Sequence, residues 1–277
     1  MTLVAGLVLF ISFFVFLFYG LPIAISIILS SIITLLLILP FDVTIATAAQ
    51  RMVTGIDDFT MLAIPLFVLA GIIMNNGGIA FRLVNFAKVL VGRLPGSLAH
   101  TNTVGNMLFG SISGSSVAAA AAMGRIMGPM EKAQGYKKEY SAAANIASAP
   151  SGLLIPPSSL LIVYSLVSGG TSIAALFIAG YIPGILWGVC CMIVAFFMAK
   201  KHGYKGSEKI SWKDKLFLFL DAIPSLLLIV IVIGGIVVGV FTATEGAAVA
   251  VLYATVLSLI YNCLLYTSPS PRDKRQS

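Results

Sequence analysis

Residues 110–116 read GSISGSS, within a stretch that is apolar enough for lipid but consists mostly of Gly, Ala and Ser. A second irregular stretch, SAPSGLLIPPSS, follows at 148–159. A helix that is interrupted at membrane depth leaves backbone N–H and C=O groups unpaired, which is costly unless protein or trapped water satisfies them. Such breaks in membrane proteins often mark ion and ligand sites. The two stretches therefore predict two broken helices and a binding site.

The composition indicates a membrane protein. Of the 277 residues, 59% are apolar and 10% are charged, and the mean hydropathy is +1.04. Since about a quarter of the residues in a soluble domain are charged, we expect an all-α polytopic membrane protein. Apolar runs that approach or exceed the roughly 20 residues needed to cross the hydrocarbon lie at 3–19, 21–39, 60–75, 159–199, 222–240 and 243–262.

The net charge of +7 is concentrated in three basic blocks. In a soluble protein such an excess would favour nucleic acid as a partner. Here the blocks flank apolar runs, so we expect no nucleic acid and place all three blocks in the cytoplasm by the positive-inside rule. They are Arg82, Lys88 and Arg93; Arg125, Lys132, Lys137 and Lys138; and Lys200, Lys201, Lys205, Lys209, Lys213 and Lys215.

The remaining charges and the segment lengths fix a path through the membrane. Residues 40–59 are expected to form a loop on the opposite face, since three aspartates outnumber Arg51 there. Residues 82–93 are expected to lie along the cytoplasmic surface, with cations facing water. Between Arg93 and Lys132 a single crossing would put two basic ends on opposite faces, so we predict a re-entrant hairpin that turns at 110–116.

The two irregular stretches carry oxygen atoms that suit a hard cation. Glycine permits tight turns, and each proline lacks an N–H and displaces the carbonyl four residues before it. Free carbonyls and hydroxyls together are typical of sodium sites in transporters. We expect the sodium ion near Ser113 and Ser151. The candidate binding residues are Ser111, Ser113, Gly114, Ser115, Ser116, Ser148, Pro150, Ser151, Gly152, Pro156, Pro157 and Ser158.

Helix packing is the alternative interpretation of these stretches, because small residues also allow membrane helices to approach closely. Asn102 and Asn106, four residues apart on one helical face, could line the site or bond across helices. Thr242 and Glu245 have the spacing of a capping box, so a structural role is favoured for Glu245.

No cofactor or resident metal is expected. Cys190, Cys191 and Cys263 lie in apolar runs without metal-ligand spacing, so we interpret them as small core or lipid-facing residues. Residues 110–114 superficially match a serine-protease motif, which would make the chain an intramembrane protease. Such an enzyme needs a base within reach of the serine, and His100 and His202 are poorly placed for it. We expect no enzyme activity.

Four stretches together resemble the large membrane subunit of tripartite ATP-independent periplasmic (TRAP) transporters: LAIPLFVLAGIIMNNGGI at 62–79, GSISGSSVAAAAAMG at 110–124, SAPSGLLIPPSS at 148–159 and FTATEGAAVAVLYA at 241–254. The resemblance covers residues 1 to about 262. It implies a multi-pass protein of the bacterial inner membrane. It also implies an elevator-type symporter that couples sodium to an organic acid anion of the C4-dicarboxylate, sialic acid or sugar-acid type. The partners that it implies are a periplasmic solute-binding protein, a small four-helix membrane subunit and membrane lipid.

The resemblance also implies two inverted repeats, of which the chain would hold the first and the start of the second. After Cys263 the sequence CLLYTSPSPRDKRQS loses the apolar pattern, so we expect a non-native tail and a truncated subunit. The expected parts are scaffold helices and a periplasmic loop at 1–59, a transport region at 60–199 with a hairpin at 94–131 and a broken helix at 138–168, a basic loop at 200–221, the second repeat from 222–262, and the tail at 263–277.

Two further interpretations remain open from the sequence. The first is a sodium/dicarboxylate symporter that works without a binding protein, and the second is a noncatalytic membrane scaffold. A gene for a solute-binding protein beside this one would exclude the first, and loss of solute uptake on deletion of the gene would exclude the second.

Overall fold

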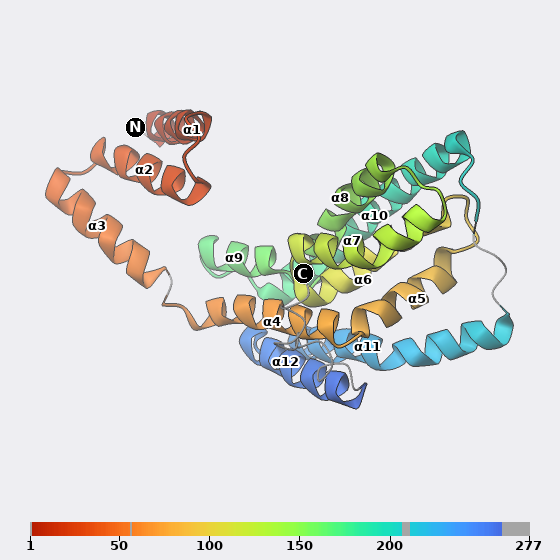
Figure 1. Cartoon of the computed structure of the whole chain (residues 1–277). Helices are drawn as coiled ribbons and strands as arrows, with labels where there is room; N and C mark the ends of the chain where they lie inside the picture. The colour runs from red at the N-terminus through yellow and green to blue at the C-terminus, as the bar shows by residue number, and fades with distance from the viewer. Residues whose placement is uncertain (1, 56, 207–210, 262–277) are drawn as a thin grey trace, which may run out of the picture. The chain divides into compact units, whose positions relative to one another are not determined.

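The computed structural model describes residues 2–55, 57–206 and 211–261, and the described residues form helices without strands. The all-α class is therefore confirmed. The expected tail at 263–277, with Cys263, lies outside the described residues. The helices, shown in Figure 1, are α1 (Thr2–Phe18), α2 (Ile23–Leu36), α3 (Phe41–Thr54), the 3-10 helix η1 (Phe59–Leu62), α4 (Ala63–Asn76), α5 (Ile79–Val91), α6 (Ser97–Ser113), α7 (Ser116–Ala133), α8 (Lys138–Leu154), α9 (Ser159–Val167), α10 (Ile173–His202), α11 (Trp212–Val238) and α12 (Ala243–Ile260).

The chain divides into two compact units, of which the first ends at Asp58. In this unit α1 and α2 pack together and α2 contacts α3. The serines that α2 buries satisfy their hydroxyls within the helix, as when Ser30 Oγ donates to Ile27 O at 3.0 Å. This is how a polar side chain is accommodated in an apolar helix.

Our prediction of a loop at 40–59 was wrong for most of its length, because α3 occupies Phe41–Thr54. No Gly or Pro interrupts these 14 residues. Asp42 lies in the first turn and Arg51 in the last turn, the arrangement that stabilises a helix dipole. The charges that we had interpreted only as a sign of sidedness therefore also favour a helix.

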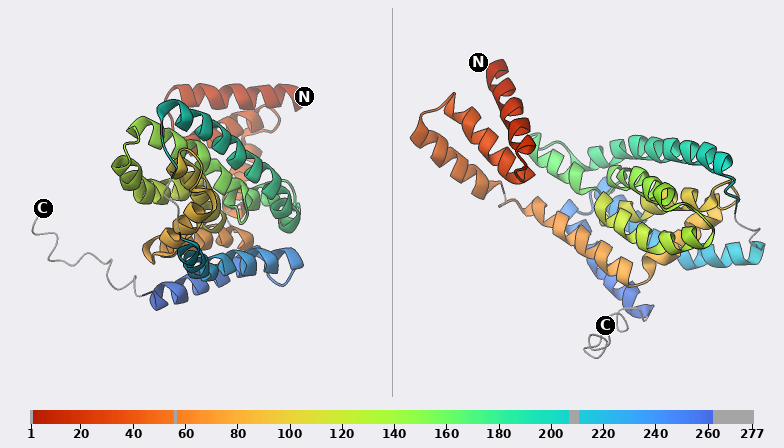
Figure 2. Two further views of the ribbon diagram at one scale, coloured as in Figure 1. Left: turned by 90° about the vertical axis from the view of Figure 1, so that its right-hand side faces the viewer. Right: turned by 45° about the horizontal axis from the view of Figure 1, so that its top comes forward.

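The second unit, from Phe59 onward, contains two groups of packed helices. In one group α4 packs against α12 and α5 packs against α11. In the other, α8 contacts α6, α7 and α10. Helix α6 also contacts α4 and α5 and so connects the groups. Figure 2 gives two further views of these helices. One apolar core, which includes Phe67, Phe109, Met123 and Leu228, continues through both groups.

Within the described residues, four segments are long and apolar enough to cross a membrane, and the bent pair α8 and α9 would make a fifth. The four segments are Phe59–Asn76, Ile173–His202, Trp212–Val238 and Ala243–Ile260. Helices α1 and α2 are apolar but shorter. The chain is a multi-pass membrane protein.

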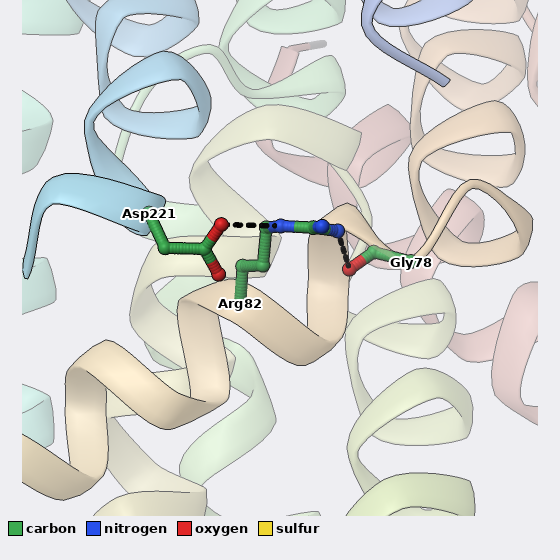
Figure 3. Close-up of polar contacts among 3 residues, drawn as sticks. All are labelled: Gly78, Arg82 and Asp221. Carbon is green, nitrogen blue, oxygen red and sulfur yellow. Dashed lines mark hydrogen bonds and ion pairs between the residues drawn. The ribbon is translucent and has the colours of Figure 1, made fainter. Parts of the chain in front are cut away.

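One ion pair fastens α5 to α11 across 139 residues of sequence. Arg82 Nε lies 2.9 Å from Asp221 Oδ1, and Arg82 Nη1 also donates to Gly78 O at 3.4 Å (Figure 3). The guanidinium carbon lies 3.5 Å from the centre of the Tyr261 ring. Arg82 thus contacts two other segments and the N-cap of its own helix, which suits the planar guanidinium group.

The predicted capping box is confirmed at the start of α12. Thr242 Oγ1 accepts from the N–H of Glu245 at 3.3 Å, and the Thr242 N–H donates to Glu245 Oε2 at 2.8 Å. Glu245 therefore caps a helix, as its spacing predicted.

Candidate functional site: two adjoining helix breaks

The first break separates α6 from α7 and consists of Gly114 and Ser115. Gly114 has φ of +62°, a left-handed conformation that glycine adopts without strain. Ser115 is extended, and its hydroxyl accepts from the N–H of Ala118 as an N-cap. The break therefore lies within the turn that we predicted at 110–116. Ser111 and Ser113 lie in the last turn of α6, and Ser116 begins α7.

The second break separates α8 from α9 and extends over residues 155–158. Our broader prediction for this stretch was wrong, because α8 continues through Ser148, Pro150, Ser151 and Gly152 to Leu154. Contacts of α8 with α6, α7 and α10 hold this helix in place and outweigh the roughly 3 kcal/mol that an interior proline costs. The break contains the buried residues Pro156, Pro157 and Ser158.

Ser158 repeats at the second break what Ser115 does at the first. Its backbone is extended, and its hydroxyl accepts from the N–H of Leu161 as the N-cap of α9. Helices α7 and α9 therefore each begin at a serine cap, with the positive end of the helix dipole directed to the break.

The structure brings the two breaks together. Ser159 Oγ donates to Gly114 O at 2.7 Å, and the Ser159 N–H donates to the same carbonyl at 3.3 Å. The residue after the second break is thus bonded to the centre of the first. Two helix C-termini and two helix N-termini meet at one point, which provides both carbonyl oxygens and N–H groups.

Glycines allow this approach. A Cβ built on Gly110 would lie 2.3 Å from Gly152 Cα, and one on Gly152 would lie 2.4 Å from Asn106 O. A Cβ on Gly71 of α4 would lie 2.6 Å from Ser113 Cβ. The packing interpretation is therefore correct for these glycines, and it does not exclude a site, because close packing is what positions the neighbouring carbonyls.

The proline pair leaves two carbonyls without their helical donors. In an α-helix the carbonyl of residue i accepts from the N–H of residue i+4. Gly152 O and Leu153 O would pair with residues 156 and 157, which are both proline and have no N–H. These carbonyls lie in the last turn of α8, in the part of that helix that packs against α6.

The serine hydroxyls near the breaks are already engaged with the backbone. Ser111 Oγ donates to Leu108 O at 2.8 Å, Ser151 Oγ donates to Ser148 O at 2.6 Å, and Ser113 Oγ contacts Ser115 O at 3.4 Å. A hydroxyl that donates in this way keeps its lone pairs. All three serines are 2% exposed or less, so their oxygens can accept from an ion or a water and from little else.

A small cavity of about 10 Å³ lies beside the breaks and includes Ser111 and Pro157 in its lining. This volume suits one water-sized particle. The rest of the lining comes mainly from apolar residues such as Phe67, Leu228 and Val232. The cavity therefore adds space next to the site but few ligands.

A polar network behind the breaks was only partly predicted. The Asn106 amide Nδ2 lies 2.8 Å from Ser148 Oγ, 3.1 Å from Asn145 Oδ1 and 3.2 Å from Asn102 Oδ1. Asn102 Nδ2 in turn donates to Glu131 Oε1 at 3.4 Å. Asn102 and Asn106 therefore bond across helices, which was one of the two roles left open.

Sequence reasoning missed Glu131 and Asn145. Glu131 is 1% exposed, and burial raises the pKa of its carboxyl group, while hydrogen bonds from Ser141 and Asn102 oppose the shift. Asn145 Nδ2 donates to Ala120 O at 2.8 Å and so ties α8 to α7. A signal was available, since Asn145 lies three residues before Ser148 and therefore on the same helical face.

The geometry does not support the protease interpretation. His100 lies in the first turn of α6, where its Nε2 lies 3.1 Å from Pro95 O. Ser111 is 11 residues further along the same helix, about 16 Å at 1.5 Å per residue. A base at that distance cannot activate the serine.

Comparison with known proteins identifies the family. Residues 10–270 match the family model described as tripartite ATP-independent periplasmic transporter, DctM component. The chain is 57% identical over 255 residues to the uncharacterized protein YgiK of Salmonella typhimurium, a match that covers 92% of this chain and 59% of that protein.

Other relatives carry functional names. The chain is 43% identical over 249 residues to the sialic acid TRAP transporter large permease protein SiaM of Vibrio cholerae, covering 90% of the chain and 58% of SiaM. It is 36% identical over 253 residues to the C4-dicarboxylate TRAP transporter large permease protein DctM of Rhodobacter capsulatus, covering 87% of the chain and 57% of DctM. The chain thus spans less than two thirds of the length of these relatives.

These matches are to transporter permeases and not to enzymes. The family match covers α6, α7, α8 and α9, and therefore both helix breaks. The chain belongs to the DctM component family of tripartite ATP-independent periplasmic transporters.

Proposed function

We propose that the chain takes part in sodium-coupled secondary transport of an organic acid anion across the bacterial inner membrane. The hydrogen bond between Ser159 and Gly114 carries this proposal. It brings the two helix breaks together, and with them their carbonyl and hydroxyl oxygens. Breaks of this kind at membrane depth form the ion sites of secondary transporters.

The proposed sodium site lies between the end of α6 and the end of α8. Its ligands are the carbonyls of Gly152 and Leu153, which lack helical donors, together with Ser113 Oγ and Ser151 Oγ. Oxygen ligands without a formal charge suit a hard monovalent cation that must also be released. Five other predicted residues shape the breaks: Gly114 turns the chain, Pro156 and Pro157 free the carbonyls, and Ser115 and Ser158 cap the following helices.

The names of the relatives support the proposed substrate class. Their names refer to sialic acid and to C4-dicarboxylates, which are both carboxylates. The N-termini of α7 and α9 direct positive dipole ends toward the breaks, which favours an anion nearby. We propose an organic acid that is delivered by a periplasmic solute-binding protein, and a small membrane subunit as partner.

We propose that α6 and α7 form a re-entrant hairpin. The two arms have 17 and 18 residues, and neither is among the segments with the length and hydropathy of a membrane span. In this topology the basic blocks are cytoplasmic, and the transport region moves as an elevator between the two faces.

The test is uptake of candidate organic acids by proteoliposomes that hold the assembled transporter, measured over a range of sodium concentrations. Ser113→Ala and Ser151→Ala should raise the sodium concentration that gives half-maximal uptake, with the largest loss of uptake at low sodium. Ser12→Ala is the matched control, because Ser12 Oγ bonds only within α1. An unchanged sodium dependence in both site variants would leave these serines with a packing role alone.

Dependence on the binding protein separates this proposal from a symporter that works alone. Uptake should require the binding protein at low substrate concentration. Equal uptake with and without it would favour the simpler symporter.

A further inference from the structure

A groove of about 370 Å³ lies between α8 and α10, away from the helix breaks, with Thr103 of α6 also in its lining. The side from α8 consists of the small residues Ala143, Ala144 and Ala147 and, at the N-terminal end of the helix, Tyr140. The side from α10 includes the larger residues Trp187, Val194 and Met198. Because alanine side chains are short, the α8 wall leaves an open channel along the helix axis beside the larger side chains of α10.

The polar groups of this groove are already satisfied within the protein. Trp187 Nε1 donates to Ala147 O at 2.8 Å, and Cys191 Sγ donates to the same carbonyl at 3.4 Å. Tyr140 Oη donates to Ala195 O at 3.2 Å, and Thr103 Oγ1 to Ala99 O at 3.1 Å. A polar ligand would find few partners here, whereas a hydrocarbon chain would bury apolar surface without leaving a donor unpaired.

The length of the groove matches one leaflet of a bilayer. Trp187 and Met198 are 11 residues apart on α10, which is about 16 Å along the helix at 1.5 Å per residue. The hydrocarbon core of a bilayer is about 30 Å thick, so the groove has the length of roughly half of it. The occupant of such a groove is a single acyl chain from one side.

Positive charge lies at the Met198 end. Lys200 and Lys201 follow within one turn on α10, and Lys137 and Lys138 precede Tyr140 at the start of α8. The Tyr140 ring lies 6.2 Å from the His202 ring, which brings these two helix ends together. All four lysines are exposed. One carboxylate, Glu139, lies beside them, so the end of the groove keeps an excess of positive charge.

We propose that the groove binds one acyl chain of an anionic phospholipid from the cytoplasmic leaflet, with the lipid phosphate at Lys138 and Lys201. Anionic lipids are attracted to basic residues at the cytoplasmic surface, and the groove converts this attraction into a defined site. The proposal depends on the membrane topology given above and is independent of sodium coupling.

Trp187 provides the measurement, because it lines the groove and Trp212 is the only other tryptophan. The chain with Trp212→Phe is reconstituted in phosphatidylcholine vesicles, and phosphatidylglycerol with brominated acyl chains is titrated in. A brominated chain in the groove quenches Trp187 fluorescence. We expect saturable quenching by brominated phosphatidylglycerol and weaker quenching by brominated phosphatidylcholine at the same mole fraction.

Charge variants identify the headgroup contact. Each lysine near the membrane surface contributes about 1 kcal/mol to anionic lipid binding, so Lys138→Gln and Lys201→Gln should each weaken phosphatidylglycerol binding about fivefold, and about 25-fold together. Lys213→Gln with Lys215→Gln is the matched control, since it removes the same charge at the start of α11. A preference for phosphatidylglycerol that survives the Lys138 and Lys201 variants would contradict the proposal.

A second pair of variants tests the groove itself. Ala143→Phe fills it and should abolish the saturable quenching, whereas Ile193→Phe, on the exposed surface of the same helix pair, should preserve it. Circular dichroism checks that both variants are folded. Equal quenching by the two lipids would mean ordinary lipid contact, and quenching by neither would mean that protein covers the groove; each result overturns the proposal. If only the assumed membrane topology is wrong, cysteine labelling at positions 57, 137 and 201 would show it.

Discussion

Ser159 Oγ donates to Gly114 O at 2.7 Å, and this bond joins the first residue of α9 to the turn between α6 and α7. The two residues are 45 positions apart in the sequence. Each break alone would leave backbone groups unsatisfied, but each supplies a partner to the other. The candidate site therefore depends on the pair of breaks.

Ser159→Ala should lower the stability of the protein by about 1 kcal/mol, the usual net contribution of one hydrogen bond. The Ser159 N–H still reaches Gly114 O at 3.3 Å, so the breaks should remain together. Thermal unfolding followed by circular dichroism measures the change. Thr255→Val in α12 removes a hydroxyl that bonds only to Val251 O and serves as control. A loss no larger than that of the control would show that the hydroxyl bond contributes nothing to joining the breaks.

Gly152→Ala should disrupt the packing of α8 on α6. The added Cβ would lie 2.4 Å from Asn106 O, a backbone atom that cannot move without shifting α6. We expect a loss of stability of about 1–3 kcal/mol, typical of overpacking. Gly128→Ala is the control, because its Cβ meets nothing within 4 Å and alanine favours the helix by up to about 1 kcal/mol. Equal unfolding temperatures for the two variants would contradict the structure here.

Arg82→Gln and Asp221→Asn test the ion pair between α5 and α11. The side chains are 24% and 30% exposed, so solvent screens the pair and the coupling energy should be about 0.5–1 kcal/mol. Arg82→Gln alone should cost more than Asp221→Asn, because Arg82 also contacts Gly78 O and the Tyr261 ring. A double-mutant cycle on the unfolding free energy gives the coupling, and a value of zero would mean that the pair is incidental.

Glu131→Gln should stabilise the protein at neutral pH and have no such effect in acid. Burial raises the pKa of the Glu131 carboxyl above its ordinary value of 4.5. The folded state therefore favours the protonated form, and the stability that this contributes is complete below pH 4.5 and is lost as the pH rises through the folded-state pKa.

The amide group that Glu131→Gln introduces would mimic the protonated acid at every pH. Unfolding temperatures of the variant and the unmodified protein, measured from acid to neutral pH, should therefore diverge as the pH rises. Parallel curves for Glu131→Gln and the unmodified protein would contradict the expected shift.

Positions 137 and 201 should be cytoplasmic and position 57 periplasmic. Single cysteines are introduced at these positions after Cys190, Cys191 and Cys263 are replaced by serine, and intact cells are treated with a thiol reagent that does not cross membranes. Labelling at 57 and not at 137 or 201 is expected from the positive-inside rule. The opposite pattern would reverse the topology and with it the leaflet of the lipid groove.

Much of the helix pattern could be predicted from the sequence, because the signals are local. Glycine at 114 permits the left-handed conformation that ends a helix, and the proline pair at 156–157 removes two consecutive N–H groups. The spacing of Thr242 and Glu245 likewise produces a cap from neighbouring residues alone. The basic loop expected at 200–221 was wrong from Trp212 onward, where α11 begins. Two other wrong predictions show the limits of such signals. A loop was expected where α3 forms, because we used its charges only to assign a face, and a break was expected at Pro150, where contacts from three helices hold α8 intact.

The sequence by itself determined that the chain enters a membrane, that two helices break and that serines and glycines gather at the breaks. These properties depend on hydropathy, backbone dihedral preferences and missing N–H groups, which each residue carries with it. Only the tertiary structure decided that Gly114 meets Ser159, that Gly110 faces Gly152, and that Asn106 bonds to Asn145 and Ser148. Such contacts join residues about 40 positions apart, and they depend on how closely helices pack, a property of several helices together that no single stretch of sequence specifies.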